Sequence, residues 1–363
     1  MKIGILTSGG DCAGLNAVMR AIGLYAYRNI KNCEIVGIPD GYGGLIRGES
    51  APMDREDFEG LLNLGGTILG TRRTPFKTMT VPEENGETRL EKMRANYKKM
   101  GLDCLFTLGG AGTHRTAALL CAEGCNVIGL PKTIDNDIYG TDVTFGFHTA
   151  VDVATEAIDR VRTTAASHGR TILVEVMGNK AGWLTLYAGI AAGAEVILLP
   201  EIPFNIDKIC EAIRENCEEG KPCNIIAVGE GAVLDSEARF KKKERVFVRT
   251  ERGETTVTQH LAEVIGERTG IETRGTVYPA RRESFAVRSG TLFQIGKLCG
   301  KTCGAGAIRR HGSRRGQGYH FQRAARHRRE VQVCRSDVGY RAPGRGYRRL
   351  FRKVSGQRGQ EKT

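Results

Sequence analysis

The chain has 363 residues, 40% of them hydrophobic, which is enough for two or three domains with proper cores. It contains no run of 18 apolar residues, no N-terminus typical of a signal peptide and no C-x-x-C pair among its eleven cysteines. We therefore expect a cytoplasmic protein without a membrane span or a zinc site. Its formal charge of +13 is unevenly divided: residues 1–276 carry 32 Lys and Arg against 37 Asp and Glu, whereas residues 277–363 carry 22 against 4.

Apolar runs that predict strands alternate with amphipathic segments that predict helices along the first part of the chain. In chain order these are strand 2–8, helix 15–28, strand and turn 33–41, strand, glycine turn and helix 104–122, strand and loop 125–137, helix 148–168, strand 170–178, helix 181–194, strand 195–201, helix 206–220 and strand 224–232. The alternation predicts an α/β fold with mainly parallel sheets covered by helices on both faces. In such sheets, ligands bind at the carboxyl ends of the strands.

Two glycine turns lead from a predicted strand into a predicted helix, TSGGDCAGLN at 7–16 and LGGAGTHRTA at 108–117. Glycine lets the backbone approach a ligand, and the start of a helix offers free N–H groups and a positive dipole end. Both turns therefore suggest phosphate binding, although a tight turn with no ligand explains the glycines too. The first matches neither a P-loop nor a dinucleotide fingerprint.

Two further loops carry charges at the same predicted edge. GGTILGTRRTPF at 65–76 contains Arg72 and Arg73, whose guanidinium groups suit phosphate oxygens, although alone they are better explained as a solvated loop. GLPKTIDNDIYG contains Asp135 and Asp137, which would project to one side of an extended loop, and Lys132. One carboxylate could hold Mg²⁺ and the other take a proton, with a polar turn as the alternative. Together the motifs suggest phosphoryl transfer.

The segments GGDCAGLN, GGTILGTRR, GGAGT, PKTIDND, EVMGNKAG, LLPE and GIETRGTV, in this order, resemble the phosphofructokinase family over residues 1–276. The resemblance implies two Rossmann-like three-layer lobes. A donor-binding lobe would span 1–138 and a fructose 6-phosphate lobe 139–250, and 251–276 would start a segment that returns to the first lobe. It also implies a cytoplasmic homo-oligomer that acts in glycolysis with Mg²⁺, takes its phosphoryl group from ATP or pyrophosphate, and binds no specific nucleic acid.

The resemblance also implies roles for individual residues. Asp135 would take the proton from the sugar 1-hydroxyl, with Thr133, Asp137 and Lys132 beside it. The donor would be bound by Gly9, Arg73, Gly110, Gly112 and Thr113. The sugar phosphate would be bound by Thr133, Asp135, Arg170, Met177, Gly178, Glu230 and Arg274. Of these, Arg170 and Arg274 would reach the site of a neighbouring subunit.

The choice of donor depends on Gly112 in this comparison. Pyrophosphate-using relatives usually carry Asp there, which would intrude on a nucleotide, whereas ATP-using relatives carry Gly. Both groups can carry Lys at position 132. We therefore expect ATP, with a pyrophosphate-dependent enzyme or a non-catalytic sugar-phosphate-binding relative as alternatives.

Three departures from the family pattern put full activity in doubt. Ala111 replaces an Asp near the metal, so the metal ligand is unknown, and Asn179 replaces an Arg. Ala280 and Glu283 stand where a His and an Arg for the substrate phosphate are expected.

The change of composition near Val277 suggests a shift of the reading frame. Codons can be chosen for 283–290 and for the segment from His311 that give family-like sequences at one common offset. We expect 277–363 to be a disordered Arg/Gly-rich tail and the chain to have low activity. The alternative is a basic arm that binds nucleic acid.

Overall fold

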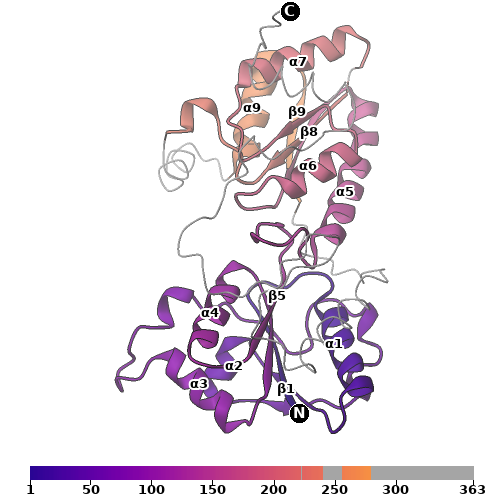
Figure 1. The fold of residues 1–363 in the computed structure, drawn as a ribbon. Coiled ribbons are helices and arrows are strands. Elements are labelled where there is room, and N and C mark those ends of the chain that lie inside the picture. The colour runs from indigo at the N-terminus through magenta and orange to yellow at the C-terminus, as the bar shows by residue number, and fades with distance from the viewer. Residues whose placement is uncertain (222, 240–255, 279–363) are drawn as a thin grey trace, which may run out of the picture. The chain divides into compact units, whose positions relative to one another are not determined.

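The structure is a computed structural model that describes residues 1–221, 223–239 and 256–278, and it divides into two compact units. Of the described residues, the first unit holds Met1–Thr149 and the second those from Ala150 onward. Each unit has its own parallel sheet with helices packed on it (Figure 1). The α/β class with mainly parallel sheets in two lobes is thereby confirmed. The boundary that we expected between residues 138 and 139 lies earlier than the observed one.

The first unit contains a five-stranded sheet in the order β3-β2-β1-β4-β5. The strands β1 (Lys2–Ser8), β2 (Glu34–Ile38), β4 (Cys104–Gly109) and β5 (Val127–Pro131) are parallel, and only the short β3 (Ala51–Pro52) is antiparallel. Almost every residue of these parallel strands is buried, which explains why they are continuous apolar runs in the sequence.

Helices cover both faces of this sheet (Figure 1). One face carries α1 (Leu15–Asn29), and the other carries α2 (Tyr42–Arg47), α3 (Arg89–Lys99) and α4 (Ala111–Ala122). Side chains from these three helices and the strands beneath them form one apolar cluster. Three short 3₁₀ turns, η1 (Glu56–Phe58), η2 (Leu61–Asn63) and η3 (Phe76–Thr78), connect the elements.

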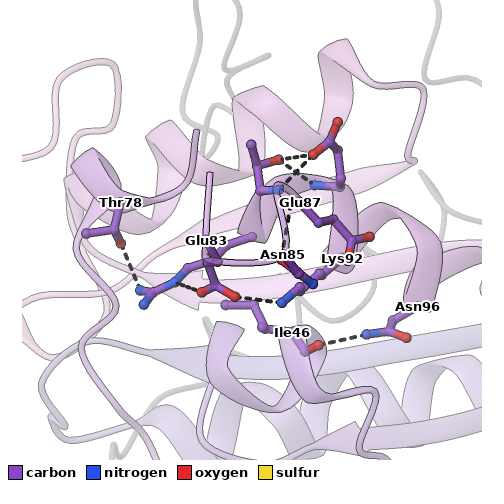
Figure 2. Close-up of polar contacts among 10 residues, drawn as sticks. Ile46, Thr78, Glu83, Asn85, Glu87, Lys92 and Asn96 are labelled. Atoms are coloured by element: carbon purple, nitrogen blue, oxygen red, sulfur yellow. Dashed lines mark hydrogen bonds and ion pairs between the residues drawn. The ribbon is translucent and has the colours of Figure 1, made fainter. Parts of the chain in front are cut away.

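Two sets of polar contacts fix the start of α3, a capping box and the ion pairs of Glu83 (Figure 2). Thr88 and Glu91 form a capping box, in which each side chain accepts the other residue's backbone N–H, at 3.2 and 2.7 Å. Glu83 pairs with Arg89 at 2.9 Å and with Lys92 at 2.6 Å, so the preceding loop is held against the helix.

The second unit contains a four-stranded parallel sheet in the order β7-β8-β6-β9. Its strands are β6 (Thr171–Val176), β7 (Val196–Leu198), β8 (Asn224–Gly229) and β9 (Thr273–Tyr278). Its helices are α5 (Phe147–His168), α6 (Trp183–Ala191), α7 (Ile206–Glu218) and α9 (Val257–Thr269), with a short 3₁₀ turn η4 (Asp235–Glu237). An apolar cluster joins β6, β7 and β8 to α7 and α9.

Residues 251–276 were predicted to start the return to the first lobe, and the structure describes them from residue 256. Residues 256–276 contribute α9 and most of β9 to the second unit, and β9 pairs with β6. Of the predicted tail, Val277 and Tyr278 are the last residues of β9, and the rest, including Ala280 and Glu283, lies outside the described residues. Within the described ranges, none of the helices combines the length and the apolar character needed to cross a membrane.

Candidate active site

The carboxyl ends of three neighbouring strands meet at one edge of the first sheet. In the register of the sheet, Ser8 of β1 pairs with Gly109 of β4, and Gly109 pairs with Pro131 of β5. The two glycine turns and the PKTIDND loop each begin at the next residue. Eight of the nine predicted donor and catalytic residues of this unit follow these strand ends, namely Gly9, Gly110, Gly112, Thr113, Lys132, Thr133, Asp135 and Asp137. The ninth, Arg73, lies in a loop that is bonded to the first turn.

The first glycine turn is joined to the arginine loop. Gly9 has a φ of 100°, and its carbonyl accepts a hydrogen bond of 2.9 Å from the Thr71 hydroxyl. Its N–H donates to the carbonyl of Arg72 at 3.3 Å. Arg72 and Arg73 are exposed, and neither forms an ion pair with another described residue. Two guanidinium groups are thus available to an anion beside the turn.

The same loop is shaped by a buried asparagine that the sequence analysis did not single out. Asn16, 1% exposed in α1, donates to the carbonyls of Leu64 and Gly65 at 3.1 Å each. Its side-chain oxygen accepts the N–H of Ile68 at 2.9 Å. A buried polar side chain with all its hydrogen bonds made fixes one conformation of the chain around it. Asn16 therefore holds the arginine loop against the first turn.

The second glycine turn leaves the start of α4 open. Gly110 is the N-cap residue, no side chain caps the helix, and no acidic residue lies in its first turn. Gly112 is exposed, and a Cβ added there would meet nothing within 4 Å. The free N–H groups and positive dipole end of α4 thus face an accessible space suited to an anion. Behind it, the Tyr42 hydroxyl donates to the carbonyl of Thr113 at 2.9 Å.

Lys132 ties the two glycine turns together. Its backbone N–H donates to the carbonyl of Gly109 at 3.0 Å, and its ammonium group donates to the carbonyl of Gly10. The side chain is only 4% exposed. A buried ammonium group is costly unless it is well bonded, so this lysine is a fixed positive charge between the turns.

We expected Asp135 and Asp137 to project to the same side of an extended loop. The loop that carries them is not extended, so this premise was wrong. Asn136 between them has a φ of 52°, and its side chain accepts the N–H of Thr144 at 2.9 Å. The Thr144 hydroxyl donates to the carbonyl of Thr133 at 2.6 Å. These bonds fold the loop back on residues 141–145 and fix the backbone on either side of the two aspartates.

Burial shifts the pKa values of two groups near Lys132. It raises the pKa of Asp137 from its usual range, and that residue's own backbone N–H and the charge of Lys132 offset the change only in part. The pKa of His114, in the first turn of α4, is lowered to about 4, mainly by burial and in part by the charge of Lys132, while a hydrogen bond with the Gly109 backbone opposes the change. His114 packs against β5, because a Cβ added to Gly129 would lie 2.5 Å from its Nδ1. In the sequence, only its place after the second glycine turn distinguishes His114, and it was not predicted.

The sugar-phosphate residues predicted in the second unit lie at opposite edges of its sheet. Met177 and Gly178 follow β6, and Glu230 follows β8 and donates its N–H to the carbonyl of Val176 at 2.9 Å. Arg170 precedes β6, and Arg274 lies at the start of β9, where it pairs with Ile172. The six residues of β6 between the two groups span roughly 20 Å. The two groups of residues in one chain therefore cannot both contact the same sugar phosphate molecule.

The two arginines share one carboxylate. Glu272 lies 2.7 Å from Nε of Arg170 and 2.9 Å from Nη2 of Arg274. The two guanidinium groups lower the pKa of Glu272, with Arg170 as the largest cause. Sequence analysis did not single out Glu272, although its place two residues before Arg274 in GIETRGTV put it on the same side of the strand.

The described residues offer Mg²⁺ no cage of their own. They contain no group of three or more His, Cys, Asp or Glu side chains that could hold a metal ion. Ala111, where the family resemblance leads us to expect a carboxylate, is the first residue of α4. Mg²⁺ commonly needs only one or two carboxylates when substrate phosphates supply the other ligands. A Mg²⁺ ion bound here would therefore depend on ligands from a phosphate donor.

The sequence profile of the family described as Phosphofructokinase matches residues 2–284. The chain belongs to the phosphofructokinase family. It is 50% identical over 277 residues to "ATP-dependent 6-phosphofructokinase" of Spirochaeta thermophila, which covers 76% of this chain and 75% of that protein. It is 46% identical over 283 residues to "Pyrophosphate--fructose 6-phosphate 1-phosphotransferase" of Amycolatopsis methanolica, which covers 76% and 79%. The family resemblance is thereby confirmed.

Solved phosphofructokinase structures share the fold. The phosphofructokinase from Saccharomyces cerevisiae aligns with a TM-score of 0.68 at 30% identity, covering 85% of this chain and 42% of that one. The two-lobed α/β architecture is therefore that of the family.

Proposed function

We propose that the chain is a 6-phosphofructokinase that transfers the terminal phosphoryl group of ATP to the 1-hydroxyl of fructose 6-phosphate. One observation carries the proposal: Lys132 binds both glycine turns, and the loop with Asp135 begins at this lysine. Anion-binding backbone, a fixed cation and a candidate base thus lie at one edge of the sheet. Relatives at 50% and 45% identity named ATP-dependent 6-phosphofructokinases support this assignment.

Each group of residues has its own role in the proposed reaction. The turn at Gly9, the start of α4 at Gly110 and the guanidinium group of Arg73 hold the donor phosphates, which carry Mg²⁺ with them. The sugar 1-hydroxyl oxygen forms a bond to the γ-phosphorus while the bond to the bridging oxygen breaks. ADP leaves with that electron pair, and Asp135 takes the hydroxyl proton. Lys132 stabilises the charge on the transferred group.

The sugar phosphate is bound by two sets of residues. Met177, Gly178 and Glu230 at the carboxyl edge of the second sheet contact the sugar phosphate of the same chain. Arg170 and Arg274, at the other edge, serve the site of a second copy, which makes the enzyme a homo-oligomer. The reaction is a step of glycolysis in the cytoplasm.

A pyrophosphate donor is the second candidate. A relative at 46% identity is named a pyrophosphate-dependent enzyme, and Lys132 occurs with both donors. The open space over Gly112 favours ATP, because a nucleotide needs that room. A Gly112→Asp variant would place a carboxylate there, and its Cβ would meet nothing within 4 Å.

The test is an assay of the chain with ATP and with pyrophosphate side by side. We expect fructose 1,6-bisphosphate from ATP, a fall in ATP-dependent turnover of at least tenfold in Gly112→Asp, and a fall of at least a thousandfold in Asp135→Asn. Undiminished turnover in Asp135→Asn would refute the assignment of the base. Binding of fructose 6-phosphate in a calorimeter with no product from either donor would show a non-catalytic relative.

The segment 277–363 bears on the rate rather than on the reaction. We propose that a shifted reading frame lowers turnover, since this segment holds 22 Lys and Arg against 4 Asp and Glu. The coding DNA tests this: a family-like continuation in another frame supports it, and its absence contradicts it. In that case, loss of DNA binding on deletion of 277–363 would indicate a nucleic-acid-binding arm instead.

A further inference from the structure

Glu201 lies just beyond β7 in the LLPE segment, to which the proposed reaction gives no role. Its Oε1 accepts a hydrogen bond of 2.7 Å from the backbone N–H of Gly182. Its Oε2 is buried and has no hydrogen-bond partner among the described residues. A buried carboxylate oxygen without a donor is costly, so its presence calls for an explanation.

The carboxylate replaces a helix cap that the sequence lacks. Gly182 is the N-cap residue of α6 and has no side chain to cap it. A Cβ at this position would lie 2.6 Å from Oε2 of Glu201 and 2.9 Å from Cδ2 of Leu199, so glycine lets both side chains approach this closely without moving. A negative charge at the N-terminus of a helix is stabilising. Glu201 therefore fixes the point where the 177–182 loop becomes α6.

That loop carries two of the proposed sugar-phosphate residues, Met177 and Gly178. Gly178 has a φ of 152°, and its carbonyl accepts the N–H of Ala181 at 2.9 Å. The loop thus has one bond that closes it from within and one, to Glu201, that attaches it to the segment after β7.

A third loop packs against the same place. A Cβ added to Gly231 would lie 2.2 Å from the carbonyl oxygen of Asn179 and 3.2 Å from Cβ of Pro200. Glu230, another proposed sugar-phosphate residue, directly precedes Gly231. The segment with Pro200 and Glu201 therefore contacts both loops that carry the proposed ligand contacts of this lobe.

We propose that Glu201 is a positioning residue of the sugar-phosphate site. By holding the N–H of Gly182, it sets the position of Met177 and Gly178 for the sugar phosphate without touching the ligand. This inference rests on the proposed function. It predicts an effect on the affinity for fructose 6-phosphate but not for ATP, because Glu201 belongs to the second unit whereas the proposed donor residues all belong to the first.

The experiment is a calorimetric measurement of the dissociation constants for fructose 6-phosphate and for ATP. Glu201→Ala removes the tie, and Glu201→Gln keeps an oxygen for the N–H of Gly182 but loses the charge. We expect the constant for fructose 6-phosphate to rise about tenfold in Glu201→Ala and about threefold in Glu201→Gln, with the constant for ATP unchanged within about twofold. Glu211→Gln, an exposed glutamate of α7 with the same change of charge, is the matched control and should bind both substrates normally.

A second measurement uses Trp183, the first residue of α6 and the only tryptophan of the chain. Acrylamide should quench its fluorescence more strongly in Glu201→Ala than in the unaltered chain or the control. Unchanged affinity for fructose 6-phosphate in Glu201→Ala overturns the positioning role and leaves the proposed function intact. Equal losses of affinity for both substrates, with a lower melting temperature, also overturn it, because Glu201 would then be only structural. Failure of the unaltered chain to bind fructose 6-phosphate overturns the proposed function and this inference together.

Discussion

At the scale of single residues, Ala111 shows most directly what one side chain can add. It is the first residue of α4, whose first turn holds no acidic residue. An Ala111→Asp variant would place a carboxylate beside the proposed donor phosphates and their Mg²⁺. We expect kcat/KM to rise at least tenfold, about 1.4 kcal/mol of transition-state stabilisation, with saturation at a lower Mg²⁺ concentration. A steady-state assay over a Mg²⁺ titration measures both.

Ala122→Asp, at the other end of the same helix, is the control for Ala111→Asp. A carboxylate there meets the negative end of the helix dipole, so it should cost about 0.3–1 kcal/mol of stability and leave the Mg²⁺ dependence unchanged. An Ala111→Asp variant with no gain in activity would show that the start of α4 does not face the metal.

His114 makes a second prediction at this scale, on stability against pH. Its pKa is about 4 in the folded protein because it is buried, whereas an unfolded histidine has a pKa of about 6.5. The unfolded chain therefore binds the proton more tightly. The contribution of neutral His114 to stability is fully present above pH 6.5. The free energy of unfolding falls by about 3 kcal/mol as the pH drops from 6.5 to 4. Urea unfolding between pH 7 and 4.5 should show a shallower decline in His114→Gln, whereas His168→Gln, at an exposed position, should follow the unaltered chain.

At the scale of elements, the sequence predicted the buried parallel strands and missed elements with weaker apolar patterns. Strands such as β1 and β6 are buried almost throughout, so their apolar runs are unambiguous. Helix α3, RLEKMRANYKK, buries only three side chains, and β9 is mostly exposed and contains a glycine. The capping-box pattern T-R-L-E at Thr88 was the available signal for α3.

The sequence predicted which strand ends the candidate residues follow, but not the bonds among them. Glycine turns at strand ends placed the donor residues, since parallel strands align their carboxyl ends. The bond from Lys132 to Gly10 joins residues 122 positions apart, and no local pattern contains it. The turn at Asn136 was missed because Asn tolerates a positive φ without a glycine to mark it.

The capping box at the start of α3 allows a test at this scale. Thr88→Ala removes the side chain that accepts the N–H of Glu91 and donates to its carboxylate (Figure 2). The loss should lower the free energy of unfolding by about 1 kcal/mol. Urea unfolding monitored by circular dichroism measures it. Thr80→Ala, an exposed threonine in the preceding loop, should change stability by less than about 0.5 kcal/mol, and equal effects of both substitutions would contradict a role for the cap.

At the scale of the whole molecule, the placement of the sugar-phosphate residues argues for shared sites. Arg170 and Arg274 lie at the amino edge of the second sheet, and Met177, Gly178 and Glu230 lie at its carboxyl edge, roughly 20 Å away along β6. Closed symmetric oligomers are the common way for one chain to bring two of its own surfaces to one site. If the arginines complete a neighbour's site, the loss of Asp135 disables the site of the same chain, whereas the loss of Arg170 disables the site of the neighbouring chain.

Mixed oligomers decide between shared and separate sites. Asp135→Asn and Arg170→Ala should each be nearly inactive alone. In dimers formed at random from equal amounts, half would contain one chain of each kind, and one of the two sites in such a dimer would have both native residues. We therefore expect about a quarter of the activity of the unaltered chain to return after the two are unfolded and refolded together. Separate refolding followed by mixing gives the baseline, and no recovery above that baseline would mean that each chain builds its own site.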